Sequence, residues 1–98
     1  MLVYRGTFDL RRVQAVSYVI KANAELERDP AAALRDAQAA LLLTPTSVRA
    51  RLAEAHAFEN LKQSEDAKRS FAAALAQAER TGAAWYPAQI AEARSGME

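Results

Sequence analysis

Apolar residues recur at helical spacing near the start of the chain. Between residues 8 and 27 they follow one another at steps of three and four residues, at Leu10, Val13, Val16, Ile20 and Ala24. Because an α-helix takes 3.6 residues per turn, this spacing places them on one face. Val19 and Leu26 widen that face. We therefore predict a first helix over residues 8–27 that packs against more than one partner helix.

Proline and small polar residues divide the rest of the chain into shorter segments. Asp29 can accept bonds from free N–H groups, and Pro30 has no N–H to lose at the first helical position, so a second helix should begin here. Pro45 should end it by disfavouring helical geometry at the residue before it. The second helix is therefore predicted over residues 30–44. The segments that follow it predict further helices over residues 47–62, 64–81 and 87–95.

The predicted turns are short and carry recognisable end signals. Thr46 or Ser47 should cap the third helix and Ser64 the fourth, while Gly82 suits the left-handed position that ends a helix. Helices joined by short turns are usually antiparallel neighbours. The pattern predicts an all-α fold of about five helices in one domain, residues 1–98.

Small and aromatic residues alternate in a fixed order in the third and fourth predicted helices, at Ala55, Phe58, Ala67, Phe71 and Ala74. Alanines allow two helix backbones to approach closely, and each phenylalanine can fill the space between one helical hairpin and the next. Identical alanines recur at an offset of 34 residues, but alanine is abundant throughout the chain. The order of small and aromatic positions is therefore the stronger evidence for a repeat.

The stretch AEAHAFENLKQSEDAKRSFAAAL resembles the tetratricopeptide repeat family, whose period is 34 residues. The preceding DPAAALRDAQAALLLTP resembles the second half of another repeat, so the resemblance spans about one and a half repeats and is clearest over residues 30–80. It implies antiparallel helical hairpins stacked as an α–α superhelix, with residues 87–95 as a capping helix.

The chain departs from the family pattern at several positions. Arg51 and Glu54 stand where bulky apolar residues are usual, although Leu52 can compensate for Glu54 by a small rotation of the helix. The first helix carries Ser17, Lys21 and Ala24 at the positions that are diagnostic of the family.

Charge and composition narrow the functional classes. The 13 basic and 12 acidic residues give a net charge of +1, which argues against a dedicated nucleic-acid-binding protein. With no cysteine, the chain has no disulfide, thiol nucleophile or thiolate metal site. No stretch approaches the roughly 18 uncharged apolar residues of a transmembrane helix, and the N-terminus does not resemble a signal peptide. We expect a soluble, cytoplasmic protein that binds neither nucleic acid nor membrane.

His56 is the only histidine, and Glu59 follows it by one turn. As a pair they could act as a general base, but no serine, cysteine or second histidine completes a recognisable catalytic or metal-binding set. The three glycines are isolated, so no phosphate-binding loop is present. We therefore predict no enzymatic activity, no cofactor and no metal, and we interpret His56 as a polar surface residue.

A partner-binding face follows from the family resemblance. In such repeats the first helix of each hairpin lines the concave side, which here implies Arg49, Leu52, His56 and Glu59 on the third helix. Tyr18, Ala22 and Glu25 take the equivalent places on the first helix. Members that bind chaperone tails use basic and asparagine side chains, but Ala22 and His56 occupy the asparagine positions, so we do not infer that ligand. Asn23 would take this place only if the first turn were one residue shorter.

The leading hypothesis is a protein–protein interaction module, an adaptor or scaffold that binds a peptide or helix of another protein on this mixed, shallow face. The alternative is a structural role, either as a dimerisation unit or as the terminal part of a longer helical-repeat protein, because about three repeats are usually needed to bury a continuous core. Leu2, Val3 and Tyr4 add apolar residues that could need a neighbour. If the role is structural, we predict a homodimer.

Overall fold

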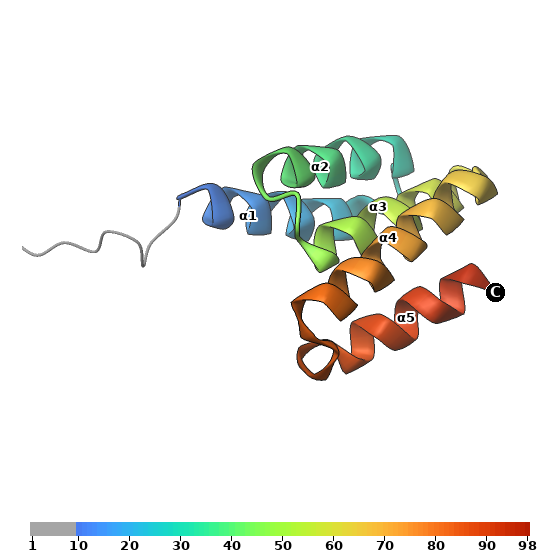
Figure 1. Cartoon of the computed structure of the whole chain (residues 1–98). Coiled ribbons are helices and arrows are strands. Elements are labelled where there is room, and N and C mark those ends of the chain that lie inside the picture. Colours follow the sequence, from blue (N-terminus) through green and yellow to red (C-terminus); the bar gives the residue numbers. More distant parts are fainter. Residues whose placement is uncertain (1–9) are drawn as a thin grey trace, which may run out of the picture.

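The computed structural model describes residues 10–98, and this part of the chain is helical without a β-strand. This part of the chain contains five α-helices joined by short turns, and Figure 1 shows how they are arranged. They are α1 (Leu10–Glu25), α2 (Pro30–Leu43), α3 (Val48–Asn60), α4 (Ser64–Gly82) and α5 (Pro87–Met97), with a short 3₁₀ turn over Ala83–Trp85 before α5. The predicted all-α fold is confirmed. The predicted start of the first helix, at residue 8, lies outside the described residues.

Two of the predicted helix caps are present. The Asp29 side chain accepts a hydrogen bond from the Ala32 N–H at 3.2 Å, and the Ser47 hydroxyl accepts one from the Ala50 N–H at 3.1 Å. The prediction for α4 is wrong by one residue. Ser64 is already its first helical residue, and Gln63 precedes it without a capping side-chain bond. Acidic residues in the first turn of α4 complement the positive end of its dipole instead.

α3 and α4 each end at or near a residue with positive φ. Lys62 has φ of 65°, and the Gln63 and Lys62 N–H groups donate to the carbonyls of Phe58 and Glu59, both at 2.9 Å. This is the double-bonded helix ending that usually uses glycine, here formed by a lysine. Gly82 has φ of 137°, as predicted for the end of α4. The short turns after α1 and α3 send α2 and α4 back along the preceding helices, so α1–α2 and α3–α4 form hairpins (Figure 1).

Alanines form the contacts between the two hairpins. A fully or almost fully buried cluster joins α1, α2 and α3, and its members are Ala22, Ala33, Ala37, Ala53 and Ala57. Because a methyl group adds little width, the backbones of these helices can approach closely. α2 packs against α3, so the second hairpin lies beside the first.

A larger side chain fills the core of the second hairpin. Phe71 of α4 is completely buried, and Leu52 and Ala55 of α3 pack in the same cluster. The cluster continues into α5, where a Cβ atom on Gly96 would lie 2.4 Å from the Phe71 ring. Only glycine therefore lets α5 lie this close to Phe71. Phe58 packs against the same cluster but remains partly exposed.

The two hairpins differ in register by one residue. Ala22 and Ala33 are buried between α1 and α2, and Ala55 and Ala67 are buried between α3 and α4. Eleven residues separate the first pair and twelve separate the second. A one-residue shift turns a helix by about 100°, so a different side of α1 faces α3 than the 34-residue offset predicts.

Candidate partner-binding groove

Two adjoining hollows follow the surface that α1, α3 and α5 share. The larger has a volume of about 570 Å³, and the residues that shape it include Val16 and Ile20 of α1, Val48 of α3 and Tyr86 at the start of α5. The smaller, of about 190 Å³, lies between α1, α3 and α5. Asn23 and Arg49 line both hollows. We name this continuous surface the α1–α3–α5 groove.

The larger hollow combines apolar walls with positive charge. Val16 and Ile20 expose 57% and 64% of their surface, which is unusual for aliphatic residues on a helix that also has a buried side. Arg12 and Arg49 add two guanidinium groups, and no acidic residue lines this hollow. Neither arginine forms an ion pair with another residue of the described range 10–98. A partner could therefore bring an apolar side chain and a negative charge to the same place.

His56 closes the opposite end of the groove by joining α3 to α5. Its Nδ1 atom lies 3.0 Å from Glu59 Oε1, and its Nε2 atom lies 2.5 Å from Glu92 Oε2 on α5. The ring also meets the buried Phe71 edge to face, with centroids 5.1 Å apart. Both ring nitrogens are therefore engaged by carboxylates, one on α3 and one on α5. Here the contact holds α5 against α3.

The structure brings together part of the predicted partner-binding set. Arg49, Leu52 and His56 line the α1–α3–α5 groove, as predicted for the third helix. Leu52 is only 4% exposed, so it forms the floor of the smaller hollow and also belongs to the core. Glu59 lines neither hollow and acts on the groove through its contact with His56.

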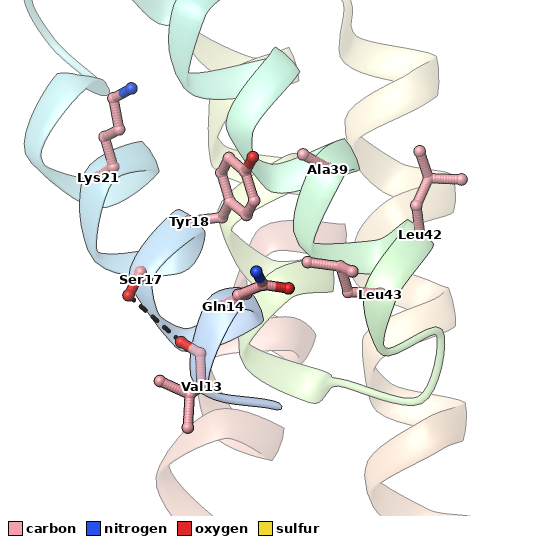
Figure 2. Close-up of a pocket in the computed structure, with 8 residues that line it drawn as sticks. All are labelled: Val13, Gln14, Ser17, Tyr18, Lys21, Ala39, Leu42 and Leu43. Atoms are coloured by element: carbon pink, nitrogen blue, oxygen red, sulfur yellow. Dashed lines mark hydrogen bonds between the residues drawn. The ribbon is translucent and has the colours of Figure 1, made fainter. Parts of the chain in front are cut away.

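The residues predicted on the first helix do not line the α1–α3–α5 groove. Tyr18 lines a different hollow, between α1 and α2, where Figure 2 shows its ring directed between the two helices. Ala22 is completely buried. The shift in register explains both, because it turns Val16, Ile20 and Asn23 toward α3 instead. The sequence offered this arrangement as an alternative, in which a first turn shorter by one residue places Asn23 on the binding face. The burial of Ala22 agrees with that alternative.

Glu25 also lies away from the groove, beside Asp36 of α2. Hydrogen bonding with the Asp36 carboxyl raises the pKa of Glu25 above its ordinary value, and burial and the Asp36 charge add to this effect. Lys21 opposes it. The Oε1 atom of Glu25 is shielded from solvent and has no hydrogen-bond partner. The carboxyl groups of Glu25 and Asp36 therefore lie close together where the end of α1 meets α2, with Lys21 near them.

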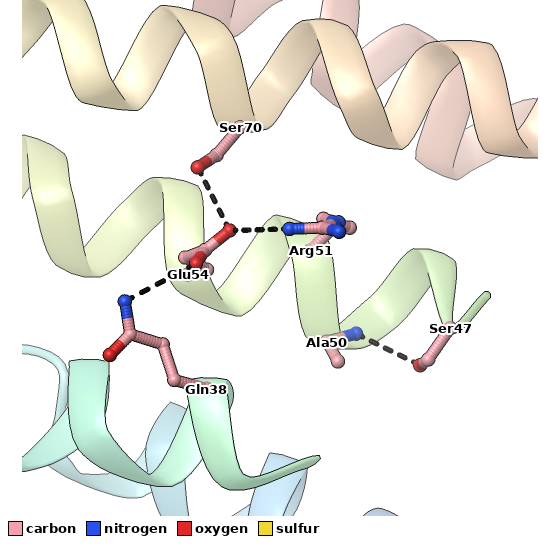
Figure 3. A network of polar contacts seen from close by, with 6 residues as sticks. All are labelled: Gln38, Ser47, Ala50, Arg51, Glu54 and Ser70. Atoms are coloured by element: carbon pink, nitrogen blue, oxygen red, sulfur yellow. Dashed lines mark hydrogen bonds and ion pairs between the residues drawn. The ribbon is translucent and has the colours of Figure 1, made fainter. Parts of the chain in front are cut away.

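A buried carboxylate fixes the position of α3 between its neighbours. Glu54 is 7% exposed, and Figure 3 shows its side chain at the centre of contacts from three helices. Its Oε1 atom accepts from Ser70 Oγ at 3.0 Å and Arg51 Nη1 at 3.2 Å, and its Oε2 atom accepts from Gln38 Nε2 at 3.4 Å. The sequence pattern indicated only a departure from the family at Glu54. Its partners come from α2 and α4 as well as from its own helix, so no local signal predicts the network.

Within residues 10–98 no three histidine or acidic side chains are grouped so that they could hold a metal ion, and no helix has the length and apolar character to cross a membrane. Comparison with known proteins finds no family model, no curated protein and no solved structure that matches this chain. The geometry of the groove is therefore the basis for inferring a function.

Proposed function

We propose that this chain is a protein–protein interaction module of tetratricopeptide type, which binds an extended segment or helix of another protein in the α1–α3–α5 groove. The observation that supports it most is the continuity of the two hollows through Asn23 and Arg49. A long, shallow groove on three helices suits a peptide, whereas small molecules usually bind in deeper, more enclosed cavities.

The lining predicts the chemistry of the partner. An apolar side chain would lie against Val16, Ile20 and Val48, where it removes exposed aliphatic surface from water. An aspartate or glutamate beside it would face Arg12 and Arg49, whose guanidinium groups bind carboxylates well. The proposed partner segment therefore carries both an apolar and an acidic residue.

The packing supports the tetratricopeptide-type arrangement in this proposal. Buried alanines lie where the helices of each hairpin meet, and Phe71 fills the core beside α5. The groove then lies along the first helix of each hairpin and the helix that follows them. In this arrangement the second helices, α2 and α4, support the groove without lining most of it.

A displayed library of random peptides, selected on the full chain, tests the proposal. Recovered peptides should share an apolar residue near an acidic one. Arg49→Glu should lower their binding at least about tenfold, since it replaces attraction by repulsion, and Ile20→Glu should do the same by placing a charge on the apolar wall. Fluorescence anisotropy with labelled peptides measures both effects.

The matched control is Arg28→Glu. Arg28 is an exposed arginine in the turn between α1 and α2 and lines neither hollow. The Arg28→Glu substitution changes the net charge by the same amount as Arg49→Glu and should leave peptide binding within about twofold of the wild type. Circular dichroism should confirm that both variants have the same helix content. Selection of no peptide, or equal losses in Arg28→Glu and Arg49→Glu, would refute the groove as the binding site.

A further inference from the structure

The surface of the first hairpin that faces away from α3 has a hollow of its own. It has a volume of about 530 Å³, and only residues of α1 and α2 line it. Figure 2 shows this side, with the other helices behind. Tyr18 and Leu43 face the space between the helices, and Leu42 projects at the edge with 86% of its surface exposed. We name this surface the α1–α2 end.

The opposite end of the helix stack is covered. α5 packs on α4, Ala93 is completely buried there, and Gly96 lies against the ring of Phe71. No helix of the described residues covers the α1–α2 end in the same way. Helical hairpins of this kind bury their faces by stacking on a neighbour, so an uncovered end with exposed aliphatic residues needs one.

We propose that the α1–α2 end binds a second copy of this chain through a two-fold contact in which each α1 packs against the α2 of the other copy. A projecting Leu42 and a hollow occur on the same surface, and a two-fold contact requires such a self-complementary patch. Since the other end is covered by α5, pairing through the one uncovered end stops at two chains and does not continue into a filament.

The charges on this surface match the same arrangement. Lys21 lies on the rim of the hollow, and Asp36 lies on α2, where its carboxyl faces Glu25. In this contact, a two-fold axis running along the hollow would bring Lys21 of each copy toward Asp36 of the other. The lysine of the partner copy would then add a positive charge beside the carboxyl groups of Glu25 and Asp36, where the Glu25 Oε1 atom has no hydrogen-bond partner within the described residues.

Light scattering on the full chain gives the first test. The wild type should show about twice the 10.7 kDa mass of one chain, and Leu42→Glu should reduce this to the single-chain mass. Ile20→Glu is the matched control, because Ile20 is exposed on the same hairpin but lines the α1–α3–α5 groove. It should leave the doubled mass unchanged, which also separates this proposal from the peptide-binding function.

A charge exchange gives the sharper test. Lys21→Glu and Asp36→Lys should each be single chains, because each places like charges opposite one another across the contact. Mixing the two variants should restore the doubled mass. The glutamate introduced in one variant would then face the lysine introduced in the other, and the unchanged Asp36 of the first would face the unchanged Lys21 of the second. A change that acts only within one chain cannot produce this rescue.

Three results would overturn the proposal. The first is a single-chain mass for the wild type at its highest soluble concentration. In that case residues 1–9 or a different protein, and not a second copy, would be the candidates to cover the α1–α2 end. The second is a dimer that Leu42→Glu leaves intact, and the third is failure of the mixed variants to associate when each is a single chain.

Discussion

The two hairpins are built on the same plan but are stabilised differently. In the second hairpin, Phe71 is fully enclosed by α3, α4 and α5, and Glu54 holds α3 to both neighbouring helices. In the first, Ala37 stands at the position 34 residues before Phe71, and small residues make up most of the buried contacts. Alanines allow close approach of helices, but each one removes little apolar surface from water.

The first hairpin consequently leaves its larger aliphatic residues outside. Leu10, Val13, Val16 and Ile20 of α1 are all about half exposed or more, whereas α3 buries its aliphatic side chains Val48 and Leu52. Both proposed interaction surfaces include residues of α1. We therefore expect the second hairpin to contribute more to the stability of the chain, and we propose that the first provides much of the surface for partners.

Phe71→Ala should destabilise the chain more than any other single change considered. Removing a fully buried aromatic side chain leaves a cavity beside α5 and should cost about 3–5 kcal/mol in the free energy of unfolding. Urea denaturation followed by circular dichroism measures it. Val19→Ala, in the core of the first hairpin, should cost clearly less. Equal losses at the two positions would contradict the difference between the hairpins.

The second prediction concerns the buried carboxylate. Glu54→Ala removes the acceptor for Ser70, Gln38 and Arg51 and should lower the free energy of unfolding by about 1–3 kcal/mol, because the buried Ser70 hydroxyl loses its partner. Glu54→Gln retains an oxygen acceptor at nearly the same volume and should cost less. The same urea measurement checks both variants, and a Glu54→Ala protein as stable as the wild type would show that the network contributes nothing.

The sequence predicts the helices well because local signals determine them. The 3.6-residue period locates each helix, and the Asp29 and Ser47 side chains form the caps that their types predict. The side of α1 that faces α3 depends instead on one residue in the turn before Pro30, which the apolar pattern does not specify. For this reason the sequence places Tyr18 and Glu25 on the groove and leaves Asn23 out.

Long-range contacts account for what the sequence could not predict. Glu54 is satisfied by side chains sixteen residues away in each direction, and His56 meets Glu92 of α5 across 36 residues. These pairs become visible only when the helices are stacked, because no periodicity relates such distant positions. The burial of Leu52 also depends on how α3 is stacked between its neighbours. The orientation of α3 that directs Glu54 toward its partners also places Leu52 in the core.

A weaker effect should appear in the pH dependence of stability at Glu25. A carboxyl whose pKa is raised in the folded state binds its proton more tightly there than in the unfolded chain, so folding loses stability as the pH rises from below the ordinary carboxyl pKa through the raised one. Glu25→Gln removes this loss. Relative to the wild type, the variant should therefore gain stability between acidic and neutral pH. Thermal unfolding of dilute protein at a series of pH values measures the gain.

Asp36→Asn provides the control, because Asp36 is the main cause of the raised pKa of Glu25. It should shift the pH profile in the same direction as Glu25→Gln, and the double variant should add little to either single change, as expected for two groups that act as one pair. If the two single changes instead added fully at neutral pH, Glu25 and Asp36 would not act as one pair. The paired carboxyl groups at the α1–α2 end would then no longer support a contact with Lys21 of a second copy.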